Sequence, residues 1–312
     1  MFRKKSRYYR GDLVEVRGHR EILATLDSEG KLDGVPFMPE MVPCCGRRFR
    51  VFRRADKTCV EGYGVRRMRD TVFLEGVRCD GASHDGCQRH CLIFWKEAWL
   101  KPVDAGDLGL GASPSAAGDQ GPEEVPPTRR NGRYFCQSTE LAGATSPLSR
   151  WNVAHFFRDM LHGELTFFRL VRIVSRMAVN RLLVLFGRGK IGSLRGAKKK
   201  ASKGDWDLRP GDWVEILTPP EIAETLNPQG KNGGLSFEPD MAEHCGRRYR
   251  VSFPIQKIIS EETGAMVELT HTVALDGVTC EGLCAKNCPR SNPLYWRECW
   301  LRPVPDGDSS SR

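Results

Sequence analysis

Two groups of cysteines in this chain have the number and spacing of metal ligands. The first group consists of Cys45, Cys79, Cys87 and Cys91, and the second consists of Cys245, Cys280, Cys284 and Cys288. The last three members are spaced C-x7-C-x3-C in the first group and C-x3-C-x3-C in the second. Zinc takes four thiolates in a tetrahedral, closed site that leaves no position for a substrate. We therefore expect one structural zinc ion in each group, and no catalytic residue among these cysteines.

The pattern leaves two alternatives to zinc open. Neither group contains the C-x2-C pair that is frequent in zinc sites, and Pro289 follows Cys288 as proline can follow a cluster ligand in iron–sulfur proteins. The thiols can also be free or form disulfides. However, the first residues, MFRKKSRYYRGD, lack the apolar stretch of a signal peptide. We expect a cytoplasmic protein, in which metal binding is favoured over disulfides for the 12 cysteines.

The two groups occupy matching places in an internal repeat with an offset of about 200 residues. Between 11–51 and 211–251 the copies align without a gap, and 20 of 41 positions are identical. GDLVEV matches GDWVEI, and CGRRFRV matches CGRRYRV. This identity indicates a duplication. Because all four cysteines occur in both copies, we expect them to act together.

Each copy has the pattern of short strands with one short helix. In the first copy Leu13–Val16 and Arg47–Val51 alternate between apolar and polar residues, which predicts half-buried strands. Further strands are expected at Thr71–Leu74 and Trp99–Val103, and a short helix at Glu21–Leu26. The predicted fold class is α+β, with two β-rich SH3-like small barrels that are joined by a linker and a central helical region.

Composition sets the expected domain boundaries. A Gly-, Ala-, Ser- and Pro-rich stretch predicts a flexible linker, and a basic stretch predicts a second one. The expected parts are a first four-cysteine module at 8–103, a flexible linker at 104–131, a helical region at 132–187, a basic linker at 188–204 and a second four-cysteine module at 205–304.

Several motifs resemble those of a bacterial protein family of uncharacterised function. They are FMPEM, CGRRFRV, RCDG followed by GCxxxC, and FWKEAWL, and the similarity extends over most of the chain. The resemblance implies a bacterial, non-secreted protein of SH3-like character. It implies no activity.

The segment 164–186 is a long amphipathic helix candidate. Its arginines at 169, 172 and 176, with Asn180, form one stripe opposite a broad apolar arc. Four arginines disfavour a membrane-spanning helix, since each costs roughly 2.5–3.5 kcal/mol near a bilayer centre. Two alternatives remain: the arc packs between the two modules, or the helix lies on an anionic membrane with help from the basic tract 188–203.

The sequence favours a binding protein over an enzyme. The sequence contains no phosphate loop, no dinucleotide fingerprint and no recognisable acid–base pair. We expect a metal-stabilised tandem-repeat binding or scaffold protein whose partner is another protein, with peripheral membrane contact as an option. An iron–sulfur redox protein or enzyme is the alternative. Nucleic-acid binding is less favoured, although the net charge of +9 is compatible with it.

Overall fold

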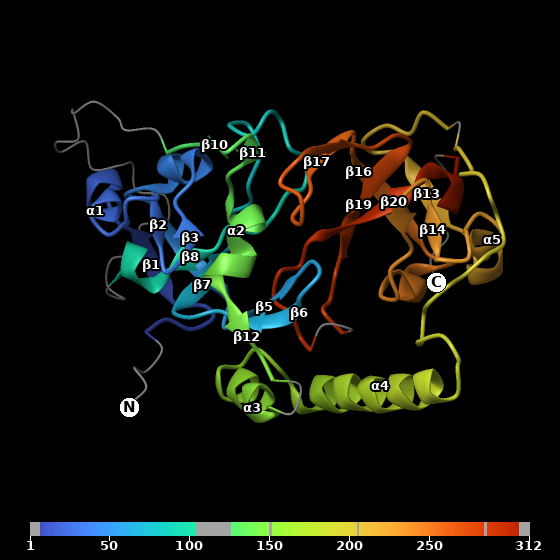
Figure 1. Ribbon diagram of the computed structural model, residues 1–312, viewed down its shortest axis with the longest axis horizontal. Coiled ribbons are helices and arrows are strands. Elements are labelled where there is room, and N and C mark those ends of the chain that lie inside the picture. Colours follow the sequence, from blue (N-terminus) through green and yellow to red (C-terminus); the bar gives the residue numbers. More distant parts are fainter. Residues whose placement is uncertain (1–6, 104–125, 150–151, 205, 284–285, 306–312) are drawn as a thin grey trace. The chain divides into compact units, whose positions relative to one another are not determined.

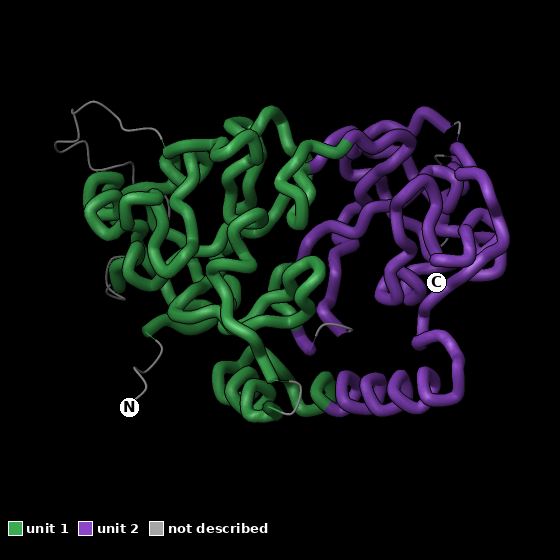
Figure 2. Tube along the Cα trace, viewed as in Figure 1, with its two compact units in different colours: residues 1–170, 259–267, 288–290 green, residues 171–258, 268–287, 291–312 purple. Residues whose placement is uncertain are grey.

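The computed structural model describes residues 7–103, 126–149, 152–204, 206–283 and 286–305 (Figure 1). The chain forms two compact units, which Figure 2 distinguishes by colour. Unit 1 contains residues 1–170, 259–267 and 288–290, and unit 2 contains residues 171–258, 268–287 and 291–312. The units do not coincide with the two repeats, because two short segments of the second repeat belong to unit 1. The fold is α+β, and its sheets are antiparallel.

Unit 1 is built on a five-stranded sheet with the order β8-β7-β4-β1-β9. These strands are β1 (Leu13–Val16), β4 (Arg48–Arg54), β7 (Thr71–Leu74), β8 (Trp95–Lys96) and β9 (Leu100–Pro102). Unit 2 has a five-stranded sheet with the order β20-β19-β16-β13-β21. Its strands are β13 (Trp213–Ile216), β16 (Arg248–Pro254), β19 (Thr272–Thr279), β20 (Pro293–Arg297) and β21 (Leu301–Pro303).

The two sheets share their strand order and register. Leu13 pairs with Arg50 in unit 1, and Trp213 pairs with Arg250 in unit 2. Each long central strand has a register shift directly after its valine, at Val51 and at Val251. Such irregularities bend and twist a strand. The equivalent positions of the sequence repeat therefore have equivalent places in the two sheets.

Shorter elements complete unit 1. They are α1 (His19–Leu23), β2 (Lys31–Leu32), β3 (Val35–Pro36), η1 (Pro39–Cys44), β5 (Lys57–Val60), β6 (Gly64–Arg67), η2 (Glu97–Trp99), β10 (Arg129–Arg130), β11 (Arg133–Tyr134), α2 (Gln137–Ala144), β12 (Ser146–Pro147) and α3 (Ala154–Leu161), where η denotes a 3-10 helix. Strands β12, β6 and β5 form a three-stranded sheet, and β2 with β3 and β10 with β11 form two hairpins.

Unit 2 has a similar set around its sheet. It contains α5 (Pro219–Ala223), β14 (Lys231–Asn232), β15 (Leu235–Ser236), η3 (Met241–His244) and η4 (Glu298–Trp300). A further hairpin is formed by β17 (Lys257–Ile259) and β18 (Met266–Glu268), and its residues 259–267 belong to unit 1.

Each unit has its own aromatic core, and tryptophans lie at the centre of both. Trp99 in unit 1 and Trp300 in unit 2 are fully buried. The Trp99 indole nitrogen donates a hydrogen bond to the Thr25 hydroxyl at 3.0 Å, and the Trp300 nitrogen donates to Thr225 at 2.9 Å. A buried indole N–H usually has such a partner. The tryptophans thus serve core packing.

The segment between the repeats differs from the expectation at the end of the predicted linker. Most of the predicted flexible linker, 104–125, lies outside the described residues. Its last part is structured, because β10 pairs there with β11. The long helix α4 (Phe167–Leu185) lies within the range 164–186 that the sequence predicts, and most of its apolar side chains are exposed, whereas Ile173 is buried. Within the described chain, no helix is both long and apolar enough to span a bilayer.

Candidate metal centre

Four thiols of unit 1 line one buried cavity of about 30 Å³. Three of them, Cys79, Cys87 and Cys91, lie in the loop between β7 and β8. The fourth, Cys136, precedes the first residue of α2. The cavity therefore joins the predicted cysteine loop to a helix terminus that comes 45 residues after Cys91 in the sequence.

Backbone hydrogen bonds fold the cysteine loop tightly. The Cys79 N–H donates to the Cys91 carbonyl at 2.9 Å, and the Cys87 N–H donates to the His84 carbonyl at 3.1 Å. The N–H of Gly86 donates to the Gly81 carbonyl at 2.9 Å. Gly81 has φ +69°, and a Cβ at this position would stand 2.1 Å from the Cys87 carbonyl oxygen. Glycine is thus required at position 81, where the backbone approaches Cys87 closely.

The start of α2 positions Cys136. The Thr139 hydroxyl accepts a hydrogen bond from the Cys136 N–H at 3.1 Å, and the N–H groups of Ser138 and Thr139 donate to the Cys136 thiol. Gln137 fixes the helix to the core, since its amide accepts from Phe94 N–H at 2.8 Å and donates to the Phe94 carbonyl at 2.9 Å. Free N–H groups at a helix start stabilise a thiolate.

Burial controls the protonation of the cavity thiols. Desolvation raises the pKa of Cys136 to about 11, and it also raises the pKa of Cys79 and of Cys87. The charge of Glu40 adds to the rise for Cys79. One oxygen of Glu40, Oε2, is buried without a hydrogen-bond partner. A cation in the cavity would reverse these shifts, because it stabilises thiolates and attracts the nearby carboxylate.

His84 lines the same cavity, but both of its ring nitrogens are engaged. Nδ1 lies 2.6 Å from Glu40 Oε1, and Nε2 lies 3.1 Å from the Phe135 carbonyl oxygen. Both partners are acceptors, so both ring nitrogens carry a proton and donate, and the imidazole is positively charged. Burial alone would lower the pKa of His84, yet these hydrogen bonds and the Glu40 charge raise it. His84 therefore orients Glu40 and is not free to bind a metal.

Two further thiols of unit 1, Cys59 and Cys288, contact each other near the cavity. The Cys59 N–H donates to Cys288 Sγ at 3.1 Å. The thiol of Cys59 also donates to Cys288, and this bond, with the nearby charge of Arg290, lowers the pKa of Cys288 to about 7 in spite of burial. The same bond raises the pKa of Cys59. Cys288 is thus the more acidic of these two thiols.

Arg290 links the pair to the cavity. Its guanidinium donates to the Cys59 carbonyl at 3.0 Å, to Glu261 Oε2 at 2.8 Å and to the Ser138 hydroxyl at 3.2 Å. Its side chain also lines the cavity. Arg290 therefore places a positive charge beside thiols that come from both repeats.

The remaining predicted ligands lie elsewhere. Cys45 is half-buried against the core of unit 1, and its sulfur lies 4.0 Å from the Met41 carbonyl oxygen rather than in the cavity. Cys245 and Cys280 belong to unit 2, where the Cys280 thiol donates to Asp240 at 3.8 Å. Cys284 lies outside the described residues. The structure therefore brings together three of the four residues predicted for the first site, and adds Cys136.

The cavity fits one ion better than a cluster. A volume of about 30 Å³ has room for one or two water-sized occupants, whereas an iron–sulfur cluster contains several iron and sulfide atoms. Across the described residues, no three His, Cys, Asp or Glu side chains already stand in the geometry of a bound metal. Closing on an ion thus requires rotation about χ1, the dihedral that places a cysteine sulfur.

The sequence-based interpretation missed Cys136, Cys59 and Arg290. Cys136 has no counterpart in the cysteine spacing of the second repeat, and Cys59 is 229 residues from Cys288. Cys59 contacts Cys288 because a short segment of the second repeat belongs to unit 1, whereas Cys136 reaches the cavity through α2. No family model, curated protein or solved structure matches the chain.

Proposed function

We propose that this protein is a metal-stabilised tandem-repeat binding protein, in which Cys79, Cys87, Cys91 and Cys136 hold one zinc ion in unit 1. The convergence of these four thiols on one buried cavity carries the proposal. Four thiolates complete the coordination of zinc and leave no open position for a substrate. The site is therefore structural, and the role of the protein is binding.

The two five-stranded sheets support the finer expectation of SH3-like barrels. In each sheet a 3-10 turn leads directly into the last strand, η2 into β9 and η4 into β21. Small β-rich modules of this size gain stability from a bound metal, because their cores are limited. The ion would connect the cysteine loop to α2, which lies outside the first repeat. It would thus fasten the barrel of unit 1 to the central region.

The test compares two serine variants of the full chain. Protein is purified without oxygen, and zinc, iron and acid-labile sulfide are measured with the visible spectrum. Cys136→Ser should lose about one zinc per chain, since zinc sites need four ligands. Cys45→Ser is the matched control, and should keep its zinc because Cys45 does not line the cavity.

Three results would contradict the proposal. Wild-type protein without metal would remove the site altogether. Iron with sulfide and broad visible absorption would establish the iron–sulfur alternative. Loss of zinc in Cys45→Ser with retention in Cys136→Ser would restore the ligand set expected from sequence. A second zinc that Cys245→Ser removes would support the predicted site of the second repeat.

A further inference from the structure

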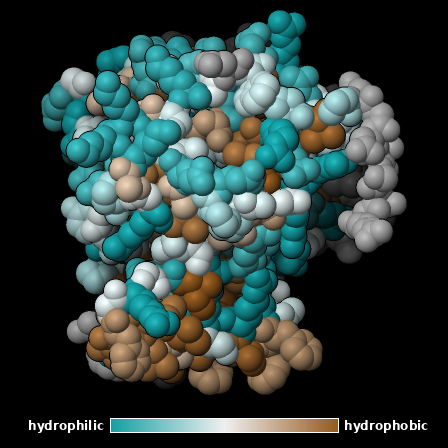
Figure 3. All heavy atoms as spheres, turned by 90° about the vertical axis from the view of Figure 1, so that its right-hand side faces the viewer, coloured by the Kyte–Doolittle hydropathy of each residue, from teal (hydrophilic) through white to brown (hydrophobic). Residues whose placement is uncertain are grey.

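Helix α4 exposes most of its apolar side chains, and Ile173 is its one buried apolar residue. Phe168 is 84% exposed and Leu185 is 75% exposed. More than half of the surface of Phe167, Leu182, Val184 and Phe186 is also accessible. Hydrophobic side chains gather along the lower edge of Figure 3, at the level that α4 occupies in Figure 1. Apolar patches of this extent mark an interaction surface.

The opposite face of α4 is polar and is attached to unit 2. Arg176 donates to Glu243 at 2.6 Å and to the Pro239 carbonyl at 3.1 Å, and it is buried. Asn180 accepts a hydrogen bond from the Ile191 N–H at 2.8 Å. An ordinary surface helix buries its apolar stripe and exposes its charges. Here the charges hold the helix in place, and the apolar stripe faces outward.

Helix α3, in unit 1, repeats this inverted arrangement. Its Asp159 forms a buried ion pair with Lys57, whose ammonium also lies 3.1 Å from His155 Nδ1. On the outer side, Phe157 and Leu161 are exposed. They are spaced four residues apart and therefore lie on one face of the helix. Two helices thus direct apolar residues outward, and charged contacts fix both of them.

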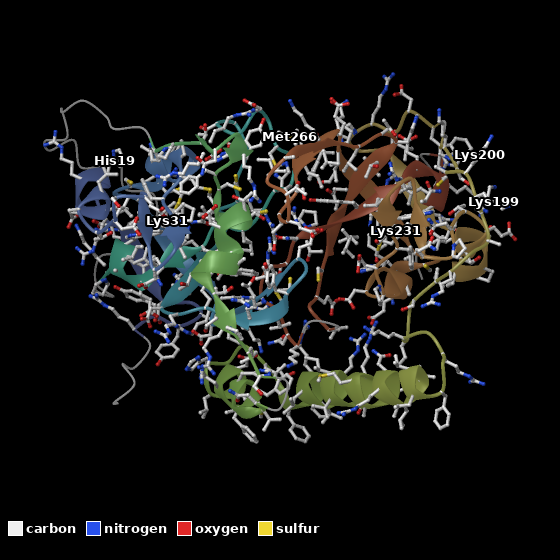
Figure 4. The ribbon with its side chains drawn as sticks, viewed as in Figure 1. His19, Lys31, Lys199, Lys200, Lys231 and Met266 are labelled. Atoms are coloured by element: carbon white, nitrogen blue, oxygen red, sulfur yellow. The ribbon has the colours of Figure 1, made fainter. Side chains whose placement is uncertain are left out.

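Positive charge is concentrated in the same part of the chain. Residues 165–204 contain 11 lysines and arginines and no aspartate or glutamate. Because the whole chain has a net charge of +9, the remainder carries about −2. Seven of the cations follow α4 and are exposed, and these are Arg188, Lys190, Arg195, Lys198, Lys199, Lys200 and Lys203. Lys199 and Lys200 lie at the outer edge of unit 2 (Figure 4).

The geometry points to docking of α4 on an anionic phospholipid bilayer, with its apolar face in the headgroup boundary and the tract 188–203 on lipid phosphates. An interfacial helix combines an apolar face with adjacent basic residues in this way. A nucleic acid would engage the cations but has no use for exposed Phe168 or Leu185. A second copy of the chain would bring two strongly basic segments together, which like charges oppose. The inference does not depend on the metal site.

The experiment measures co-sedimentation of the full chain with lipid vesicles. Vesicles contain phosphatidylcholine alone or phosphatidylcholine with phosphatidylglycerol. Wild-type protein should bind the anionic vesicles and remain in solution with the neutral ones. A Phe168→Asp, Leu185→Asp double variant should need roughly 100-fold more lipid, since each side chain loses its apolar burial. Replacing the three lysines 198–200 by glutamine should weaken binding to anionic vesicles roughly 100-fold.

Tyr63→Asp is the matched control, because Tyr63 is 65% exposed in unit 1 and lies on neither helix. It should bind vesicles as the wild-type protein does. Unchanged circular dichroism establishes that each variant is folded. The proposal is overturned if wild-type protein ignores anionic vesicles, or if the Phe168 and Leu185 variant binds them normally. It is also overturned if the wild-type protein is a dimer that the Phe168 and Leu185 double variant dissociates. Binding of a DNA duplex equally to the wild type and to the double variant, with displacement of the wild type from vesicles, would overturn it as well.

Discussion

Replacing Gly81 by alanine should open the cysteine loop, and Gly76 provides a control in the same loop. Both glycines have left-handed backbones, with φ +69° at Gly81 and +71° at Gly76. A Cβ on Gly76 would meet nothing within 4 Å, whereas a Cβ on Gly81 would stand 2.1 Å from the Cys87 carbonyl oxygen. The difference between the two variants therefore isolates the effect of the close approach.

The magnitude follows from the local contacts. An alanine in the left-handed region costs about 1–2 kcal/mol, and this applies to both variants. In Gly81→Ala the loop must also separate, which breaks the hydrogen bonds from Gly86 to Gly81 and from Cys87 to His84. Each is worth about 1 kcal/mol. We expect a loss of local stability of about 3–4 kcal/mol for Gly81→Ala, against about 1–2 kcal/mol for Gly76→Ala.

Hydrogen exchange with mass spectrometry measures this difference locally. Peptides that cover residues 79–91 should exchange about 30-fold faster in Gly81→Ala than in Gly76→Ala, because 2 kcal/mol corresponds to that ratio. Zinc content should fall only in Gly81→Ala. Equal exchange rates in the two variants would refute the reasoning, since the loop would then tolerate a Cβ against Cys87.

Two further outcomes test the attachment of α4 and the core of unit 2. Burial alone would raise the pKa of Glu243, but hydrogen bonds and charge from Arg172 and Arg176 lower it below 4.5. These ion pairs therefore stabilise the folded state above pH 4.5, and their stabilisation is lost as the pH falls through the lowered pKa. The protection factor of the α4 amides, which is the ratio of intrinsic to observed exchange rate, should therefore fall on acidification below pH 4.5. A Glu243→Gln variant should lack this step. Trp300→Ala should lower the stability of unit 2 by about 3–5 kcal/mol in urea unfolding. Thr225→Val removes only the hydroxyl that accepts the indole hydrogen bond, and should lower stability by about 1 kcal/mol. Equal losses in the two variants would contradict the packing role of Trp300.

Local patterns predicted the strands well. The alternation in Leu13–Val16 and the apolar run Thr71–Leu74 correspond to β1 and β7 with the same bounds. The strand expected at Arg47–Val51 is longer, because β4 continues to Arg54 beyond an irregular register. Strand periodicity depends on neighbours in the chain, so it can be read from sequence. The register shift after Val51 depends on the partner strand, so it cannot be read from the sequence of β4 alone.

The candidate site was predictable only in part, for a different reason. Cys79, Cys87 and Cys91 share one loop, so spacing alone groups them. Cys136 reaches the cavity through the packing of α2, and Arg290 reaches it because its segment of the second repeat belongs to unit 1. Such contacts are set by tertiary structure.

The amphipathic pattern likewise identified α4 as a helix but not the face that it turns outward. A hydrophobic arc has the same periodicity whether it is buried or exposed. The ion pairs of Arg172 and Arg176 with Glu243 decide the orientation in unit 2, and these residues are about 70 positions apart in the sequence. The charge pattern of the helix alone does not contain this information.

The segments that unit 1 takes from the second repeat set an order of events during synthesis. Leu170 and Cys288 are 118 residues apart, so at 5–20 residues per second the ribosome adds the second part about 6–24 s after the first. Until then the cavity lacks Ile259 and Arg290 from its wall. Its thiols remain open to the solvent during this interval. The zinc ion proposed above would thus be able to enter during this interval, before Ile259 and Arg290 complete the cavity wall.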